Sequence, residues 1–107
     1  RRTLEAMVGV GSVVLIPELL SRPLRDGNAD EVAALEALLS RLTLIEADAP
    51  TARLAAAFGA TYGLRAADAL HLATAVAAGA DRFITNNRRD FGQEIAEIAV
   101  VDPDGLA

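Results

Sequence analysis

Three acidic residues are the side chains in this sequence whose types and positions could do chemistry: Glu18, Asp68 and Asp90. Each lies beside a segment that the residue pattern predicts to be a short buried strand or the first turn of a helix. Carboxylate oxygens are the ligands that hard divalent cations prefer. If the fold gathers these three side chains, they form a small acidic pocket that can bind such a cation.

The elements that must position these acids follow from hydrophobic periodicity. Short apolar runs rich in β-branched residues predict strands at 12–16, 42–45, 82–85 and 98–101. Residues 1–8 are predicted to be the end of a helix. Further helices are predicted from Pro17 to about Pro23, from Asp30 to the second strand, from Asp48 to Tyr62, and over 65–78. Asp48 is the predicted N-cap of its helix, and Gly63 and Gly79 are predicted to end the last two. Helices that alternate with short apolar strands predict an α/β fold with a parallel sheet, and residues 1–107 are predicted to form one domain.

This arrangement predicts that the acids converge. Binding sites of open parallel sheets form outside the carboxyl ends of the strands. Glu18 follows the strand at 12–16, and Asn87 and Asp90 follow the strand at 82–85. Asp68 lies in the first turn of the helix that precedes this last strand. Because a crossover helix runs antiparallel to its sheet, its first turn lies at the same edge.

Each acid also has a purely structural explanation. A carboxylate in a first helical turn, as at Glu18 and Asp68, complements the helix dipole by roughly 0.3–1 kcal/mol. Asp90 could stabilise a loop through an Asx turn. The acids that fit solvated helix faces much better than a pocket are Glu31, Glu36 and Glu46.

Composition narrows the chemistry further. Apolar residues make up 52% of the chain and no apolar run approaches the roughly 20 residues of a membrane span, so we expect a cytoplasmic domain. There is no cysteine and His71 is the single histidine, which excludes thiolate catalysis and a clustered zinc site. We expect His71 to pack or to form a hydrogen bond near the pocket. The net charge of −5 argues against a broad nucleic-acid surface, although arginines gather locally at 22 and 25 and at 88 and 89.

Three stretches together resemble the PIN domain, and particularly bacterial VapC-like toxins. The first is Glu18-Leu19-Leu20-Ser21-Arg22-Pro23-Leu24. The second runs from Leu64 to Ala75 and contains Asp68-Ala69-Leu70-His71-Leu72-Ala73. The third is Phe83-Ile84-Thr85-Asn86-Asn87-Arg88-Arg89-Asp90-Phe91. Their order and spacing match the family across nearly the whole chain, and the second and third stretches form a specific pair.

The resemblance implies a three-layer α/β/α fold with a short parallel sheet and a Mg²⁺- or Mn²⁺-dependent hydrolysis of RNA phosphodiester bonds. By position, Glu18, Asp68 and Asp90 correspond to catalytic, metal-binding carboxylates, with Thr85 and Asn87 in support. Many family members carry an acid where Asn87 stands, and others carry it just before the phenylalanine, as this chain does. The direct ligand in this loop is therefore either Asn87 or Asp90.

The chain departs from the family at its beginning, because nothing in it resembles the family's first strand, which ends in an Asp-Thr or Asp-Ser pair. We expect a gap at the centre of the sheet, one metal ligand fewer, and low stability and activity for this chain alone. As a toxin it would be neutralised by a VapB-like antitoxin, and the helical face from Asp30 to Leu42 offers apolar surface for that partner or for a homodimer, unless it packs in the core. The alternatives are a catalytically silent PIN-like module that binds protein or RNA, and an unrelated α/β domain.

Overall fold

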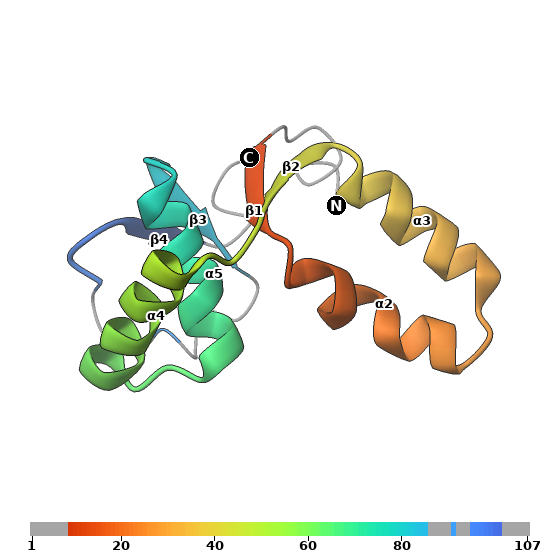
Figure 1. Ribbon diagram of the computed structural model, residues 1–107. Coiled ribbons are helices and arrows are strands. Elements are labelled where there is room, and N and C mark those ends of the chain that lie inside the picture. Colours follow the sequence, from red (N-terminus) through yellow and green to blue (C-terminus); the bar gives the residue numbers. More distant parts are fainter. Residues whose placement is uncertain (1–8, 86–90, 92–94, 102–107) are drawn as a thin grey trace.

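The computed structural model describes residues 9–85, 91 and 95–101. In this part of the chain, helices and short strands alternate in the order β1 (Gly9–Ser12), α2 (Leu15–Arg25), α3 (Ala29–Leu39), β2 (Leu42–Ile45), α4 (Ala49–Tyr62), α5 (Ala66–Ala77), β3 (Arg82–Ile84) and β4 (Ala99–Val101). Helices α2 and α3 lie to one side of β1 and β2, and α4 and α5 lie to the other (Figure 1). The predicted three-layer α/β fold is therefore confirmed. No helix among these residues is long and apolar enough to cross a bilayer.

The strands pair in parallel, as predicted. Strand β1 pairs with β2 from Gly9 opposite Leu42 to Ser12 opposite Ile45, and β3 pairs with β4 in the same sense. Within the described residues these are two two-stranded sheets that are not hydrogen-bonded to each other, which agrees with the expected gap between strand pairs. Parallel strands need a crossover between them, and the α2–α3 hairpin supplies the crossover from β1 to β2.

Helix α5 holds the two strand pairs together. It packs against α4, β1 and β3, so it contacts both sheets. Its inward face consists of Ala69, Leu72 and Ala73, with Leu72 and Ala73 fully buried. Small side chains on a helix face let the neighbouring backbones approach closely, while burying one leucine contributes about 1.5–3 kcal/mol. The buried core around α5 comprises Ala55, Phe58, Ala69, Leu72, Ala73, Phe91, Ile95 and Ile98.

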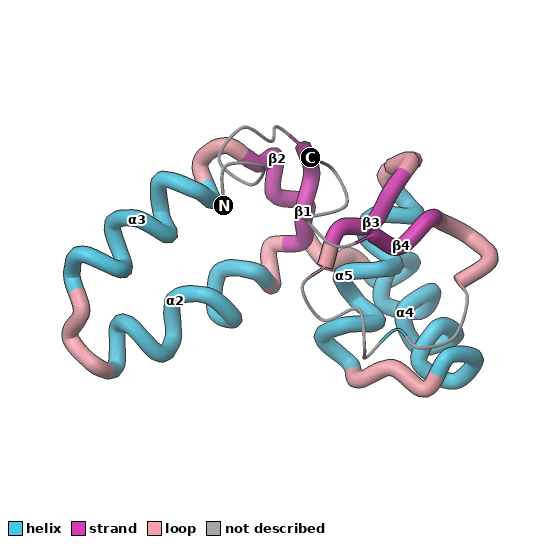
Figure 2. Tube along the Cα trace, turned by 180° about the vertical axis from the view of Figure 1, so that it is seen from behind, coloured by secondary structure: helices cyan, strands magenta, loops and turns pink. Residues whose placement is uncertain are grey.

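Helices α2 and α3 form a hairpin that extends away from α4 and α5 (Figures 1 and 2). Gly27 makes the turn with a positive φ of 68°, which favours glycine. The Asn28 side chain then caps α3 by accepting a hydrogen bond from the Glu31 backbone N–H at 3.1 Å. Leu20 and Leu39 are buried inside the hairpin. The rest of the predicted apolar stripe of α3, at positions 32, 35 and 38, is only half-buried.

The predicted first strand at 12–16 was wrong, because β1 spans Gly9–Ser12 and α2 begins at Leu15. Strand β2 has only four residues, so the hydrogen-bond ladder between β1 and β2 is short. The ladder ends where Val13 N–H donates to Ile45 O at 2.9 Å. The Ser12 hydroxyl then accepts a hydrogen bond from Val14 N–H at 3.1 Å and starts the turn into α2. Gly11 is therefore a strand residue. A Cβ there would lie 2.8 Å from the Leu15 side chain.

The other predicted element boundaries differ less from those in the structure. Helix α2 continues to Arg25 with Pro23 inside it, although we expected it to end near Pro23. The absence of one N–H donor so close to the helix end costs less than it would in the middle. In α4, Ala55 is buried and Ala57 is exposed. The strand at 42–45 is confirmed. The predicted helix at 1–8 lies outside the described residues.

Asp48 caps α4, as predicted, and gives a pH-dependent test of the fold. Its carboxylate accepts a hydrogen bond from Thr51 N–H at 2.9 Å. Bonding to the Thr51 side chain, and then to its backbone N–H, lowers the pKa of Asp48 from its ordinary value of 3.8. Because the folded-state pKa is depressed, this stabilisation is present above pH 3.8 and is lost as the pH falls through the lowered pKa.

We expect Asp48→Ala to lower the melting temperature at neutral pH by about 4–8 °C, since α4 loses its N-cap. Asp48→Asn is the matched control, because an amide oxygen accepts the same bond without titrating. The two variants are compared with the parent chain by circular dichroism during heating, from neutral pH down to about pH 2. An Asp48→Ala chain as stable as the parent at neutral pH would contradict this assignment of the cap.

Candidate functional site

A hydrogen bond joins the beginning of α2 to α5. His71 Nε2 lies 2.6 Å from Glu18 Oε1, although the residues are 53 positions apart in sequence. Glu18 is in the first turn of α2, as predicted, with its side chain 38% exposed. The His71 side chain is only 12% exposed. The contact therefore connects the partly exposed Glu18 carboxylate to the mostly buried His71 ring on α5, which packs in the core.

Asp68 stands one helical turn before His71. It lies in the first turn of α5, as predicted, and is half-buried. Residues three apart on a helix share a face, with about 5–6 Å between their Cβ atoms. Glu18 thus contacts α5 at the residue three positions after Asp68. A carboxylate in each first turn also faces the positive end of its helix dipole.

The third predicted region begins where β3 ends. Thr85, the next residue, is half-buried and its N–H donates to Val101 O at 3.0 Å, which extends the ladder with β4 by one bond. Asn87 and Asp90 lie outside the described residues. Phe91 is 6% exposed and packs edge-on against Phe83 of β3, with ring centroids 5.3 Å apart.

The donor chemistry fits a hard divalent cation. Glu18 and Asp68 supply carboxylate oxygens, which Mg²⁺ and Mn²⁺ prefer over nitrogen or sulfur. Across residues 9–85, 91 and 95–101, no group of three or more His, Cys, Asp or Glu side chains is arranged to hold a metal ion. The described pair would thus be part of a ligand set, and the predicted third carboxylate, Asp90, lies outside those residues.

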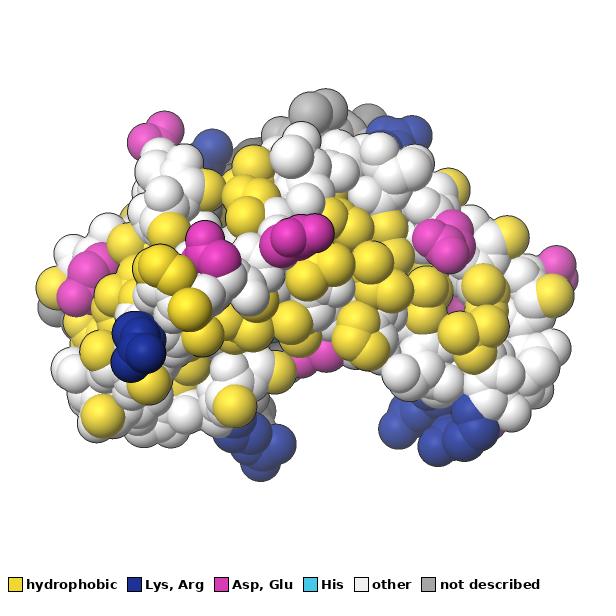
Figure 3. Space-filling model, in the orientation of Figure 1, with side chains coloured by type: hydrophobic (Ala, Val, Ile, Leu, Met, Phe, Trp, Pro, Cys, Tyr) yellow, Lys and Arg dark blue, Asp and Glu magenta, His cyan; other side chains and the backbone are white. Residues whose placement is uncertain are grey.

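Positive charge flanks this acidic neighbourhood. Arg22 follows Glu18 by four residues on α2, and Arg65 precedes Asp68 by three residues at the N-cap of α5. Both arginines are exposed. Figure 3 shows arginine side chains projecting below α2 and below the beginning of α5, on either side of a hollow with an acidic side chain visible inside it. The hollow therefore combines an acidic centre with basic margins.

Sequence reasoning did not anticipate the partner of His71 or the position of Arg65. The histidine was expected to pack or to form a hydrogen bond near the pocket, and the structure identifies Glu18 as its partner. The three-residue spacing from Asp68 to His71 was the available signal, since it puts both on one helix face. The same spacing from Arg65 to Asp68 was available for the arginine, since the predicted helix begins at residue 65.

These features define a small α/β domain with parallel strands and a carboxylate in the first turn of each of two helices, α2 and α5. The PIN domain family matches residues 1–97, and the chain belongs to this family. A solved structure described as a toxin-antitoxin complex from Klebsiella pneumoniae is similar over 96% of this chain and 85% of its own, with 27% sequence identity and a TM-score of 0.75. No curated protein matches the sequence significantly. PIN domains are generally nucleases, which classes the chain with hydrolases at that coarse level.

Proposed function

We propose that this protein is a Mg²⁺- or Mn²⁺-dependent endoribonuclease of a type II toxin-antitoxin system, a VapC-like toxin that acts in the cytoplasm. The observation that supports the proposal is the 2.6 Å contact between Glu18 and His71, because it joins the first turn of α2 to α5 one helical turn after Asp68. Membership of the PIN family and the likeness to a toxin-antitoxin complex support it. The third carboxylate of the proposal is Asp90, with Thr85 and Asn87 in support.

The residues of the site would share the work of phosphodiester hydrolysis. Glu18 and Asp68 would hold the divalent cation with Asp90 and neutralise its charge. When bound, such a cation polarises water and stabilises the charge that develops on the leaving oxygen. One carboxylate would accept the proton of the attacking water as the new phosphorus–oxygen bond forms and the old one breaks. Thr85, at the end of β3, would orient the substrate by hydrogen bonding.

A polynucleotide suits the charge distribution of the hollow. The net charge is −5, so long-range attraction to RNA is weak, and binding must come from local groups. Arg22 and Arg65 stand one turn from Glu18 and Asp68, on separate helices. They could contact the phosphates on either side of the one that is cleaved. Guanidinium groups bind phosphate oxygens in pairs, which also fixes the direction of the chain.

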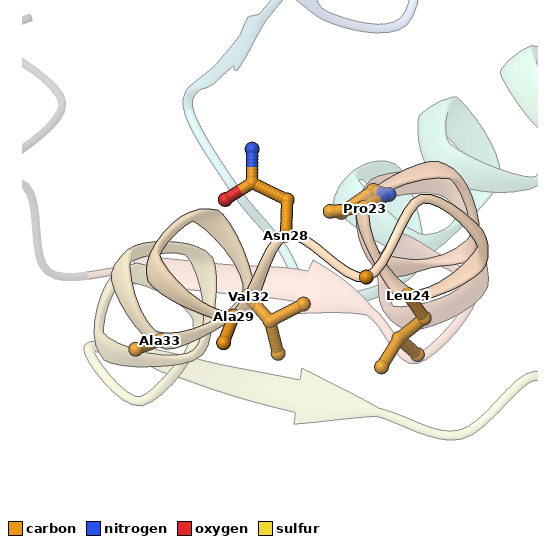
Figure 4. Close-up of a pocket in the computed structure, with 7 residues that line it drawn as sticks. Pro23, Leu24, Asn28, Ala29, Val32 and Ala33 are labelled. Carbon is orange, nitrogen blue, oxygen red and sulfur yellow. The ribbon is translucent and has the colours of Figure 1, made fainter.

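An apolar hollow in the α2–α3 hairpin suits an antitoxin helix. It has a volume of about 330 Å³ and is lined by Pro23, Leu24, Gly27, Asn28, Ala29, Val32 and Ala33. Figure 4 shows Leu24 and Val32 on the facing helices, directed to the same side of the turn between them. Leu24 is 62% exposed. Grooves with apolar anchors of this kind bind the apolar face of an amphipathic helix.

Replacement of the proposed ligands tests the catalytic assignment. We expect Glu18→Gln, Asp68→Asn and Asp90→Asn each to lower RNA cleavage by at least about 100-fold in Mg²⁺, because each removes a charge on which cation binding depends. Glu36→Gln, on the exposed face of α3, is the control and should cleave like the parent chain. EDTA should abolish cleavage by the parent.

The assay follows the cut ends of a labelled RNA produced by the 107-residue chain. Folded proteins that bind RNA or a partner but never cut it, with and without Mg²⁺, would favour the catalytically silent module. Equal activity of Asp68→Asn and parent would refute the site.

Neutral substitutions of the flanking arginines test how RNA is held. We expect Arg22→Gln and Arg65→Gln to raise KM for RNA and to reduce the dependence of binding on salt by about 0.7 in log–log slope for each phosphate that the protein no longer neutralises. Arg41→Gln, in the exposed turn between α3 and β2, is the matched control. Binding is measured by fluorescence anisotropy at several salt concentrations. An unchanged slope in both variants would argue against direct binding of phosphates by these arginines.

A charged side chain in the hairpin hollow tests the partner site. We expect Leu24→Asp to weaken binding of the cognate antitoxin by roughly tenfold or more, since a carboxylate in an apolar groove must lose its hydration. RNA cleavage should persist. Ala34→Asp, on an exposed part of α3 outside the hollow, is the control. Calorimetric titration with the purified antitoxin measures the effect, and equal affinities for the two variants would place the partner elsewhere.

A further inference from the structure

We infer that His71 is a positioning residue for the proposed metal site, which fixes the Glu18 carboxylate in the direction of Asp68. The inference rests on the proposed function, but it concerns a residue that the carboxylate assignment does not include. Its basis is the single contact between His71 Nε2 and Glu18 Oε1, at 2.6 Å. This distance is short even for a charge-assisted hydrogen bond, for which about 2.7–2.9 Å is typical.

The two partners differ in how firmly the fold holds them. His71 follows Leu70 and precedes Leu72, and the helix that carries all three is packed against α4 and both sheets. Its ring is 12% exposed, so few ring positions are open to it. Glu18 projects from the exposed first turn of the α2–α3 hairpin and has three rotatable side-chain bonds. The histidine is therefore the fixed partner, and the glutamate is the one whose conformation the bond selects.

The geometry of the bond leaves the carboxylate able to bind a cation. It engages Oε1 through the ring nitrogen, while a carboxylate has a second oxygen and further lone pairs. Asp68 lies one turn toward the start of α5, on the face that carries the ring. An outer partner that donates to a ligating carboxylate sets its orientation, and removal of that partner typically weakens metal binding by about 10–100-fold.

A purely structural role makes a different prediction. If the contact served only to fasten α2 to α5, its removal would lower stability and leave cation binding unchanged in the folded protein. Tyr62, at the end of α4, provides a comparison, because its hydroxyl donates to Glu97 Oε1 at 2.6 Å and accepts from Ala96 N–H at 3.3 Å. Tyr62→Phe therefore removes two long-range hydrogen bonds without altering Glu18, Asp68 or His71.

The experiment measures Mn²⁺ binding by calorimetry, without RNA, for the full chain and for His71→Leu, His71→Gln and Tyr62→Phe. The glutamine amide reaches about as far as Nε2 and can donate to the same oxygen, whereas leucine cannot. We expect His71→Leu to weaken Mn²⁺ binding by roughly 10–100-fold, with His71→Gln within a few-fold of the parent and Tyr62→Phe unchanged. Thermal unfolding establishes that each variant is folded. If His71→Leu does not fold, His71→Asn replaces it, because its amide is too short to reach Glu18.

A folded variant that lacks the donor but binds Mn²⁺ as tightly as the parent would overturn the inference. The inference would also fail if His71→Gln weakened Mn²⁺ binding as much as His71→Leu does. It would fail as well if His71→Leu weakened Mn²⁺ binding by the same factor in a Glu18→Gln chain, since His71 would then act independently of Glu18. These outcomes differ from a failure of the proposed function. A parent chain that binds Mn²⁺ but cuts no RNA refutes the nuclease alone, and a parent that binds no Mn²⁺ refutes both.

Discussion

The burial of one face of α5 is the constraint on which the rest of the structure depends. Leu72 and Ala73 are fully buried, and Ala69 is 2% exposed. This face packs on α4, β1 and β3, so a single helix connects two strand pairs that are not hydrogen-bonded to each other in the described residues. Once this face is turned inward, the helix period leaves Asp68 and His71 on the adjoining, half-exposed stripe. The packing of the core thus sets the orientation of the candidate site.

The structural and the functional explanation of Glu18 and Asp68 are compatible with each other. Glu18 and Asp68 each lie in a first helical turn, where the dipole favours a negative charge. The Glu18 carboxylate also has a hydrogen-bond partner on the body of the fold, because His71 of α5 contacts its Oε1. Arg22 and Arg65 add positive charge at the margins. The helix dipoles, the histidine and the arginines therefore stabilise the negative charge of the carboxylates, whose remaining oxygen atoms could still bind a cation.

The α2–α3 hairpin has apolar side chains that remain exposed or half-buried, and these could serve as a binding surface. It buries Leu20 and Leu39, but the apolar stripe of α3 stays half-buried and Leu24 is largely exposed. The hairpin extends away from the core on one side of β1 and β2, and the molecule measures 39 × 31 × 23 Å (Figure 1). The same hairpin carries Glu18 at its beginning. A partner seated on its apolar surface would therefore act close to the proposed catalytic centre.

The sequence by itself determined the classes of element, the parallel pairing and the positions of Glu18 and Asp68 in first helical turns, because these follow from local periodicity and from capping residues such as Asp48. It placed β1 wrongly, since the ladder with β2, which lies about 30 residues further on, sets where that strand ends. Only the tertiary structure decided that Glu18 bonds to His71. This contact depends on how two helices are oriented by their buried faces, and side-chain packing between distant segments leaves no periodic trace in the sequence.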